Sequence, residues 1–186
     1  MKKTLFALAL AAALPLSLQA AERSYTYVEG AYVRASEDAN GFGLRGSVAF
    51  ADTGFYGLAS YANIDVDFLG DTIDTNQFEI GAGYALNLSD RADLITELAY
   101  RRVGAEFRGV SSDADGYRLS VGSRFSFTDN FEGIAKANYL DSGDLGDDVS
   151  GTFGLLAKFS ETWAVTGEVE LDGDDESYLI GLRAHF

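Results

Sequence analysis

The chain has 186 residues, a formal net charge of −15 and no cysteine. The absence of cysteine excludes disulfide bonds and thiolate metal sites. So large an excess of acidic residues argues against nucleic-acid binding, because attraction to phosphates dominates that recognition. A GxGxxG pattern at residues 41–46 lacks the following helix that dinucleotide binding requires, and we expect no cofactor.

Residues 1–20 have the features of a secretory signal peptide. Lys2 and Lys3 give a basic start, an apolar run covers residues 5–14, and small residues lead to Ala20. The apolar run is shorter than the roughly 20 residues that a transmembrane helix needs, which disfavours a retained anchor. We therefore expect Sec-dependent export, cleavage before Ala21, and one mature domain over residues 21–186.

The clearest structural signal lies in the last ten residues of the chain. Side chains of a β-strand alternate between two faces, and here one face is apolar while the other is mostly polar. The apolar face carries Tyr178, Ile180, Leu182, Ala184 and Phe186. Such a strand suits a membrane barrel, with lipid outside and a polar interior. The terminal Phe186 also resembles the insertion signal of bacterial outer-membrane barrels, so these five residues are predicted to form that signal.

The same two-residue alternation recurs along the whole mature chain. It is regular in segments 42–50, 77–88, 117–127, 152–160 and 177–186, whereas a helix would scatter these residues around its circumference. Less regular segments lie between them, at residues 25–34, 55–66, 94–107, 131–140 and 163–171. Together they predict an all-β protein, a transmembrane antiparallel up-and-down β-barrel of ten strands. Eight strands is the alternative, with two of the weaker segments in loops.

The connections between the predicted strands are of two alternating kinds. Short ones lie at residues 52–54, 89–93, 128–130 and 160–162, and longer acidic ones at 35–40, 67–76, 108–115, 141–149 and 172–176. Short periplasmic turns and longer external loops are typical of outer-membrane barrels. Aromatic residues cluster near both ends of the strands, as expected at two lipid–water interfaces. A soluble β-sandwich accounts for the alternation but not for both aromatic belts and a signal peptide.

The pattern over the mature chain resembles the small outer-membrane β-barrel proteins of Gram-negative bacteria, a group that includes the OmpA transmembrane domain, OmpX and OmpW. Within that group, the signal sequence and residues 24–34 are similar to a family described as a diffusible or immunity-activating outer-membrane factor. The resemblance implies location in the bacterial outer membrane and release in outer-membrane vesicles. It also implies contact with membrane lipid and lipopolysaccharide, and assembly by periplasmic chaperones and the barrel-assembly machinery. We expect a monomer, although the oligomeric state stays open.

The inward-facing sides of the predicted strands carry acidic and basic residues in near balance. The predicted lumen charges are Glu29, Arg45, Glu79, Glu97, Arg101, Arg118, Arg124, Glu132, Lys136, Lys158, Glu168, Glu170 and Arg183. Charges confined to a narrow lumen need partners or water, because an isolated buried ion is very unfavourable. We expect an ion-pair network that blocks the interior, and a narrow channel for small solutes or ions is the alternative.

The acidic loops suggest a second kind of site. Asp141, Asp144, Asp147 and Asp148 are candidate ligands for a hard cation such as Ca²⁺, which prefers carboxylates. Their spacing does not match an EF-hand loop, and a solvated anionic surface is the favoured interpretation.

An enzyme is the remaining alternative. The barrel enzymes that this architecture resembles use a histidine, and the sole histidine, His185, is predicted at the periplasmic rim, far from substrates in the outer leaflet. The sequence therefore favours a non-enzymatic barrel with a structural or surface-interaction role in the envelope.

Overall fold

A computed structural model describes residues 23–36, 39–68, 71–141, 143, 146–173 and 175–186. The predicted signal peptide and Asp144 lie outside the described residues. Within the described part of the chain, no helix is long and apolar enough to cross a membrane.

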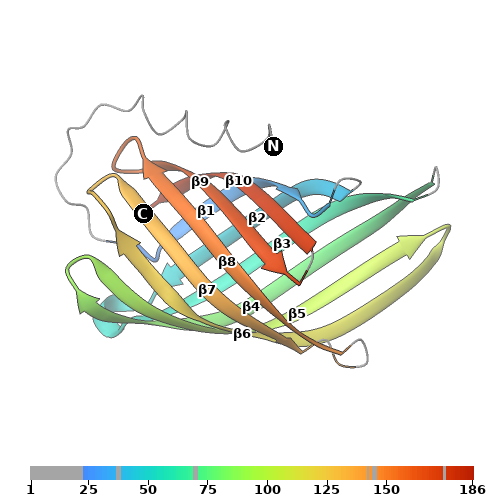
Figure 1. Ribbon diagram of the computed structural model, residues 1–186, viewed down its shortest axis with the longest axis horizontal. Helices are drawn as coiled ribbons and strands as arrows, with labels where there is room; N and C mark the ends of the chain where they lie inside the picture. Colours follow the sequence, from blue (N-terminus) through green and yellow to red (C-terminus); the bar gives the residue numbers. More distant parts are fainter. Residues whose placement is uncertain (1–22, 37–38, 69–70, 142, 144–145, 174) are drawn as a thin grey trace.

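The described residues form one closed barrel of antiparallel strands (Figure 1). The strands are β1 (Tyr27–Arg34), β2 (Ala39–Ala49), β3 (Phe55–Phe68), β4 (Asp71–Ser89), β5 (Ala92–Phe107), β6 (Val110–Ser126), β7 (Phe131–Asp141), β8 (Asp147–Lys158), β9 (Trp163–Asp172) and β10 (Asp175–His185). Each strand pairs with its neighbours in the chain, and β1 pairs with β10 to close the cylinder. The prediction of ten up-and-down strands is confirmed, and the alternative of eight is wrong.

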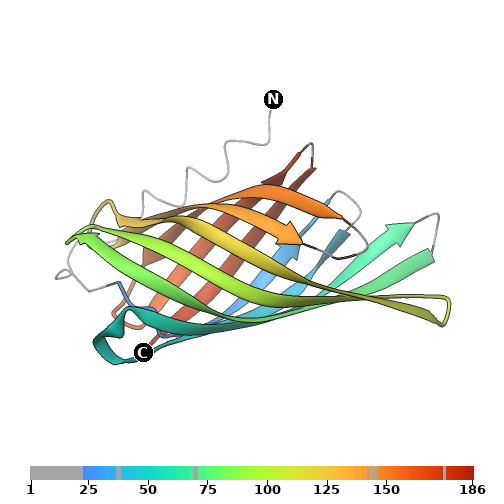
Figure 2. The same cartoon turned by 90° about the horizontal axis from the view of Figure 1, so that it is seen from below.

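The two ends of the barrel differ. At the turn end, β2–β3, β4–β5, β6–β7 and β8–β9 are connected, β1 begins and β10 ends; a short 3₁₀ helix (Ala51–Thr53) lies in the first of these connections. At the loop end, the remaining hairpins close. There β3–β4 and β5–β6 project well beyond the other strands (Figure 2).

These two hairpins correct the predicted loops at residues 67–76 and 108–115, which are mostly strand. Cross-strand pairing continues in register to Phe68 opposite Asp71 and to Phe107 opposite Val110. The ladder continues because exposed charged residues do not interrupt main-chain pairing, while β-branched residues such as Ile73 favour extended backbone. Acidic composition alone is therefore a poor marker of where a strand ends.

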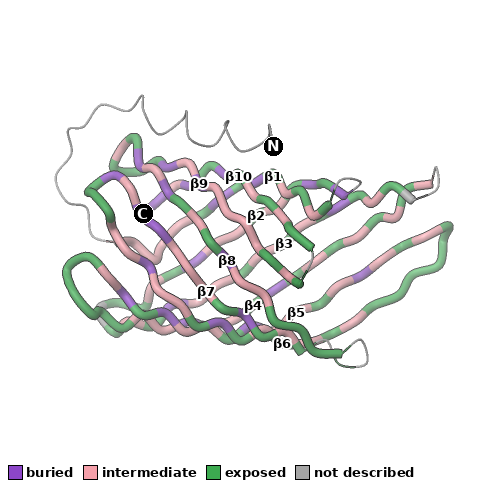
Figure 3. The backbone as a smooth tube through the Cα atoms, in the orientation of Figure 1, coloured by how far each residue is buried: buried purple, intermediate pink, exposed green. Residues whose placement is uncertain are grey.

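Burial alternates along the strands with the period of two that the sequence predicts (Figure 3). On β1, Glu29 is 1% exposed, while Val28 and Tyr32 on the other face are 48% and 42% exposed. The predicted register of this strand, with Glu29 inside, is thus confirmed. Large apolar side chains such as Phe42, Leu155 and Ile180 cover the outer face instead of the interior. The barrel is therefore polar inside and apolar outside.

Aromatic side chains gather near both ends of this outer face. Phe50, Phe55, Phe127, Phe159, Trp163 and Phe186 are exposed near the turn end, and Tyr32, Phe42, Phe78, Tyr117, Phe153 and Tyr178 are exposed toward the loop end. Several form ring pairs across neighbouring strands, such as Tyr32 with Phe42, whose centroids are 5.5 Å apart. Two such belts are typical of a barrel that meets lipid headgroups at two levels.

Candidate functional site: the ion-paired lumen

The first cluster of lumen charges lies at the seam between β1 and β10. Glu29 lies directly opposite Arg183 on β10 and Arg45 on β2. The Arg183 and Arg45 Nε atoms donate hydrogen bonds of 2.7 Å to the two carboxylate oxygens of Glu29. Arg45 also reaches across β1 and β10 to donate two 2.8 Å hydrogen bonds to Glu168 on β9. This two-pronged pairing fixes the guanidinium plane across the lumen.

A second cluster lies nearer the loop end. Glu79 pairs with Arg118 and with Arg101, whose Nε is 3.5 Å from the Glu79 carboxylate. Arg101 also donates a hydrogen bond to Gln77, and Arg118 lies 3.9 Å from Glu170 on the far side of the lumen. The cluster therefore links β4, β5 and β6 to β9.

Neutral side chains extend this second cluster. The amide of Asn138, which is 2% exposed, donates hydrogen bonds to the hydroxyls of Ser150 and Thr152 and accepts one from Ser120. Ser150 in turn donates to Glu170. The sequence does not predict these residues, because hydroxyl and amide side chains on an inward face carry no charge signal.

Two further groups of charges lie toward the turn end. Lys136 donates a 3.0 Å hydrogen bond to Glu97, which also accepts one of 2.8 Å from the Tyr56 hydroxyl. Glu132, 2% exposed, pairs with Arg124 at 2.6 Å and with Lys158 at 2.5 Å. Every predicted lumen charge thus lies inside the barrel and has at least one oppositely charged partner there.

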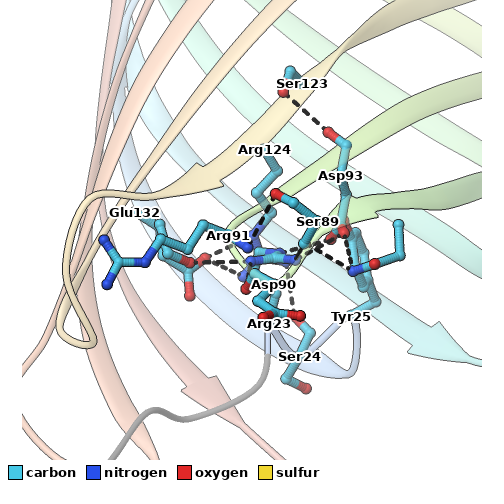
Figure 4. A network of polar contacts seen from close by, with 12 residues as sticks. Arg23, Ser24, Tyr25, Ser89, Asp90, Arg91, Asp93, Ser123, Arg124 and Glu132 are labelled. Carbon is cyan, nitrogen blue, oxygen red and sulfur yellow. Dashed lines mark hydrogen bonds and ion pairs between the residues drawn. The ribbon is translucent and has the colours of Figure 1, made fainter.

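The segment that precedes β1 also enters the lumen, which the sequence pattern does not predict. Figure 4 shows Arg23 lying against Asp93 and the β4–β5 connection. The Tyr25 hydroxyl donates to the same carboxylate at 2.8 Å. Tyr25 was predicted in the first strand and Asp93 in a turn. The strand instead begins at Tyr27, which frees Tyr25 to cross the lumen, and Asp93 is a buried residue of β5.

These contacts determine the charge states of Arg23 and Tyr25 at the turn end of the barrel. The hydrogen bond to Asp93 raises the pKa of the Arg23 guanidinium, and burial raises the pKa of the Tyr25 phenol. At neutral pH, Arg23 is therefore charged and Tyr25 is a neutral hydrogen-bond donor.

Two cavities lie in the lumen among the described residues. The larger, of about 360 Å³, opens toward the loop end, and the smaller, of about 70 Å³, lies toward the turn end. Arg45, Lys136 and Glu168 line both cavities. These three side chains, joined to Glu29 and Glu97 by ion pairs, lie where the two cavities meet, and we call them the partition.

The other predicted residues are placed as follows. Tyr178, Ile180, Leu182 and Phe186 of the predicted insertion signal are exposed on the outer face of β10, with Ala184 partly exposed between them. Asp141 lies opposite Asp147 at the loop end, and Asp148 is exposed beside them. Among the described residues, no three acidic or histidine side chains are grouped to hold a metal ion.

His185 turns inward at the turn end, where it is 7% exposed. Its ring lies 6.3 Å from that of Tyr27. The structure thus places the histidine inside the barrel at its turn end, away from the loop end where the acidic hairpins project.

A closed antiparallel barrel with an apolar outer face and a charged lumen defines the class of protein: the chain has the fold of outer-membrane β-barrels. No family model matches it. Among solved structures, the KdgM porin has a TM-score of 0.52 at 16% identity, over 86% of this chain and 99% of that one. The β domain of the Bordetella autotransporter BrkA has a TM-score of 0.50 at 14% identity, over 88% and 99%.

Two curated relatives are similar in sequence. The putative uncharacterized protein YaiT of Escherichia coli (strain K12) is 30% identical over 164 residues, which cover 74% of this chain and 17% of that protein. The uncharacterized protein YaiT of Salmonella typhimurium (strain LT2) is 32% identical over 156 residues, covering 70% and 16%. The chain therefore spans less than a fifth of the length of these relatives.

Proposed function

We propose that this chain is a non-enzymatic barrel of the bacterial outer membrane, with its turn end in the periplasm and its loop end outside the cell. The apolar outer face and its two aromatic belts support this location, because a large exposed apolar surface needs lipid around it. Outer-membrane lipid and lipopolysaccharide then surround the barrel. Periplasmic chaperones and the barrel-assembly machinery serve it during assembly, directed by the exposed face of β10.

The proposed role is structural and surface-interacting, with a lumen that does not conduct. The observation that carries it is the partition of Arg45, Lys136 and Glu168, whose charges are all paired. These ion pairs are largely shielded from solvent, with side-chain exposures of 17–23%, and a side chain that swings away leaves its partner uncompensated inside the lumen. The barrel then acts as a fixed scaffold in the envelope.

This scaffold presents the two projecting hairpins to the outside. Asp65, Asp67 and Asp74 on β3–β4 and Glu106 and Asp113 on β5–β6 are exposed. Their charge favours basic partners at the cell surface. A deletion strain tests the role: we expect unchanged permeability to dyes, detergents and small solutes, together with altered surface adhesion.

Conductance of the purified protein in planar bilayers tests the closed lumen directly. We expect no steady current from the wild-type protein. The double variant Arg45→Ala/Glu168→Ala removes both partners of one pair and leaves Glu29 paired with Arg183. It joins the two cavities and is expected to conduct small ions. Arg102→Ala/Asp113→Ala, an exposed pair outside the lumen, is the matched control. Large steady wild-type currents contradict the proposal.

A narrow channel is the second candidate function. It is favoured by the closeness of the two cavities, which share Arg45, Lys136 and Glu168 as lining residues. In that case the wild-type protein gives small, brief currents that Lys136→Ala enlarges, whereas the closed barrel gives none.

A further inference from the structure

The segment before β1 follows an unusual course across the turn end of the barrel. Thr26 is tied to the wall, because its carbonyl accepts a hydrogen bond from the Phe186 amide and its hydroxyl accepts one from the Ala49 amide. From this point, residues 23–25 extend away from the wall, although the Ser24 hydroxyl still donates a hydrogen bond to the Phe186 carbonyl. They end against β5, which is four strands from β1 in one direction and six in the other. The segment therefore crosses the mouth of the cylinder.

Arg23 is the anchor at the far side. Its guanidinium donates to both carboxylate oxygens of Asp93, at 2.8 and 2.9 Å, and to the carbonyls of Ser89 and Asp90. The side chains of Arg23 and Asp93 are only 8% and 6% exposed. A bidentate pair with two further hydrogen bonds positions the guanidinium far more strictly than an exposed ion pair does.

Tyr25 fills the space between the anchor and the wall. Its ring stacks on Tyr56 with a centroid distance of 4.8 Å, and the Arg124 guanidinium lies 4.9 Å from its centroid. Arg124 also donates to the Ser24 carbonyl at 2.9 Å. Tyr25 and Tyr56 both line the smaller cavity, so the crossing segment borders that cavity through Tyr25.

We propose that residues 23–25 are a latch that closes the turn-end mouth and opens by swinging about Thr26. Arg23, Ser24 and Tyr25 make these contacts with side chains, with the Ser89 carbonyl at the end of β4 and with the Asp90 carbonyl beyond it. None of them is a main-chain hydrogen bond between strands, so opening leaves the strand pairing intact. The latch is separate from the Arg45–Glu168 partition: three residues across the mouth bar bulky solutes but leave room for small ions, so the Arg45→Ala/Glu168→Ala variant still conducts. The latch rests on the proposed function only for the assignment of the turn end to the periplasm. It does not depend on whether ions pass the partition.

Thiol labelling tests the latch, because the chain has no cysteine of its own. Thr166 is 2% exposed and lines the smaller cavity, so Thr166→Cys reports access to that cavity. The full-length protein, folded in detergent, is treated with a charged methanethiosulfonate reagent. Adding Arg23→Ala or Asp93→Asn is expected to speed labelling roughly tenfold or more, since the rate follows the population of the open state. Arg91→Ala, an exposed arginine in the same connection, is the control and leaves the rate unchanged.

A second measurement uses no cysteine variant. In the folded wild-type protein, trypsin is expected to cleave after the exposed Arg108 but not after Arg23, and Asp93→Asn makes the Arg23–Ser24 bond cleavable. Equal labelling rates in the parent and latch variants, with trypsin cleaving after Arg23 in the wild-type protein, overturn the latch. That result bears on the latch and does not change the conductance expected in bilayers. Conductance of the wild-type protein bears on the partition and does not change the labelling rates expected for the latch.

Discussion

Glu29 and Arg183 lie directly opposite each other at the seam where the first strand of the chain meets the last. Their 2.7 Å hydrogen bond joins two residues that are 154 positions apart in the sequence. Arg183 also lies 3.8 Å from the ring centroid of Tyr27, which covers it from the turn end. The seam that closes the barrel is therefore held by charge inside the lumen as well as by main-chain pairing.

This arrangement predicts that Glu29→Ala is strongly destabilising. The change leaves Arg183 buried with no carboxylate and Arg45 with Glu168 alone, at a loss of about 3–5 kcal/mol in the free energy of unfolding. Urea unfolding in lipid vesicles measures it. Glu176→Gln, at an exposed position, is the control and is expected to change little. A loss below about 1 kcal/mol for Glu29→Ala contradicts a role of this pair in stability.

A second prediction concerns the outer face. Leu155 is 62% exposed at the middle of β8, and Leu171 is 43% exposed near the loop end of β9. In lipid vesicles, Leu155→Arg is expected to cost about 2–4 kcal/mol and Leu171→Arg about 0–1 kcal/mol, because the penalty depends on depth in the bilayer.

The same pair of variants distinguishes lipid from water around the barrel. Equal, small effects at both positions would show that the middle of β8 is not in contact with hydrocarbon. Wild-type protein that stays folded and monodisperse in buffer without detergent would lead to the same conclusion.

The sequence predicts the wall of this barrel well and its cross-lumen contacts poorly, for a physical reason. Alternation of two faces along one strand is a local property, so the inward positions of Glu29, Arg45 and Arg183 follow from the sequence. The partner of each charge depends on strand tilt and on the stagger between strands. Arg45 meets Glu168 across two intervening strands, a contact that no local pattern contains.

The latch was missed for a related reason. Tyr25 and Tyr27 share the alternation of β1, so the pattern gave no sign that the strand begins only at Tyr27. The available signal for a missing cation was Asp93, which faces inward at the turn end. The residues opposite it on β4 and β6 are Asn87 and Arg124, so Arg124 is the one basic partner that strand pairing offers. Arg124 is instead paired with Glu132, and the cation comes from Arg23.

A third prediction concerns the space that Gly83 leaves for Tyr56. A Cβ atom at position 83 would lie only 2.2 Å from the Tyr56 ring, which is 3% exposed and donates to Glu97. Gly83→Ala therefore displaces Tyr56 and is expected to cost about 1–3 kcal/mol. Gly167→Ala, where no atom lies within 4 Å, is the matched control.

The tyrosine itself provides the check on this explanation. If the clash with Tyr56 causes the loss, the effect of Gly83→Ala largely disappears in a Tyr56→Ala background, giving a non-additive double-mutant cycle in urea unfolding. Additive effects of the two changes would place the strain elsewhere.

The last prediction separates assembly from stability at the final residue. Phe186 is 77% exposed on the outer face, and its backbone amide, which any residue supplies, makes the hydrogen bond to Thr26. Phe186→Ser therefore removes an apolar side chain from lipid but keeps the seam. We expect purified Phe186→Ser protein to refold in detergent like the wild type, while its folded fraction in the outer membrane of cells falls severalfold, as measured by heat-modifiable migration in gels. Phe159→Ser, at another exposed aromatic of the same end, serves as the control for loss of apolar area. Equal losses in cells for both variants would mean that Phe186 contributes to the aromatic belt and carries no insertion signal.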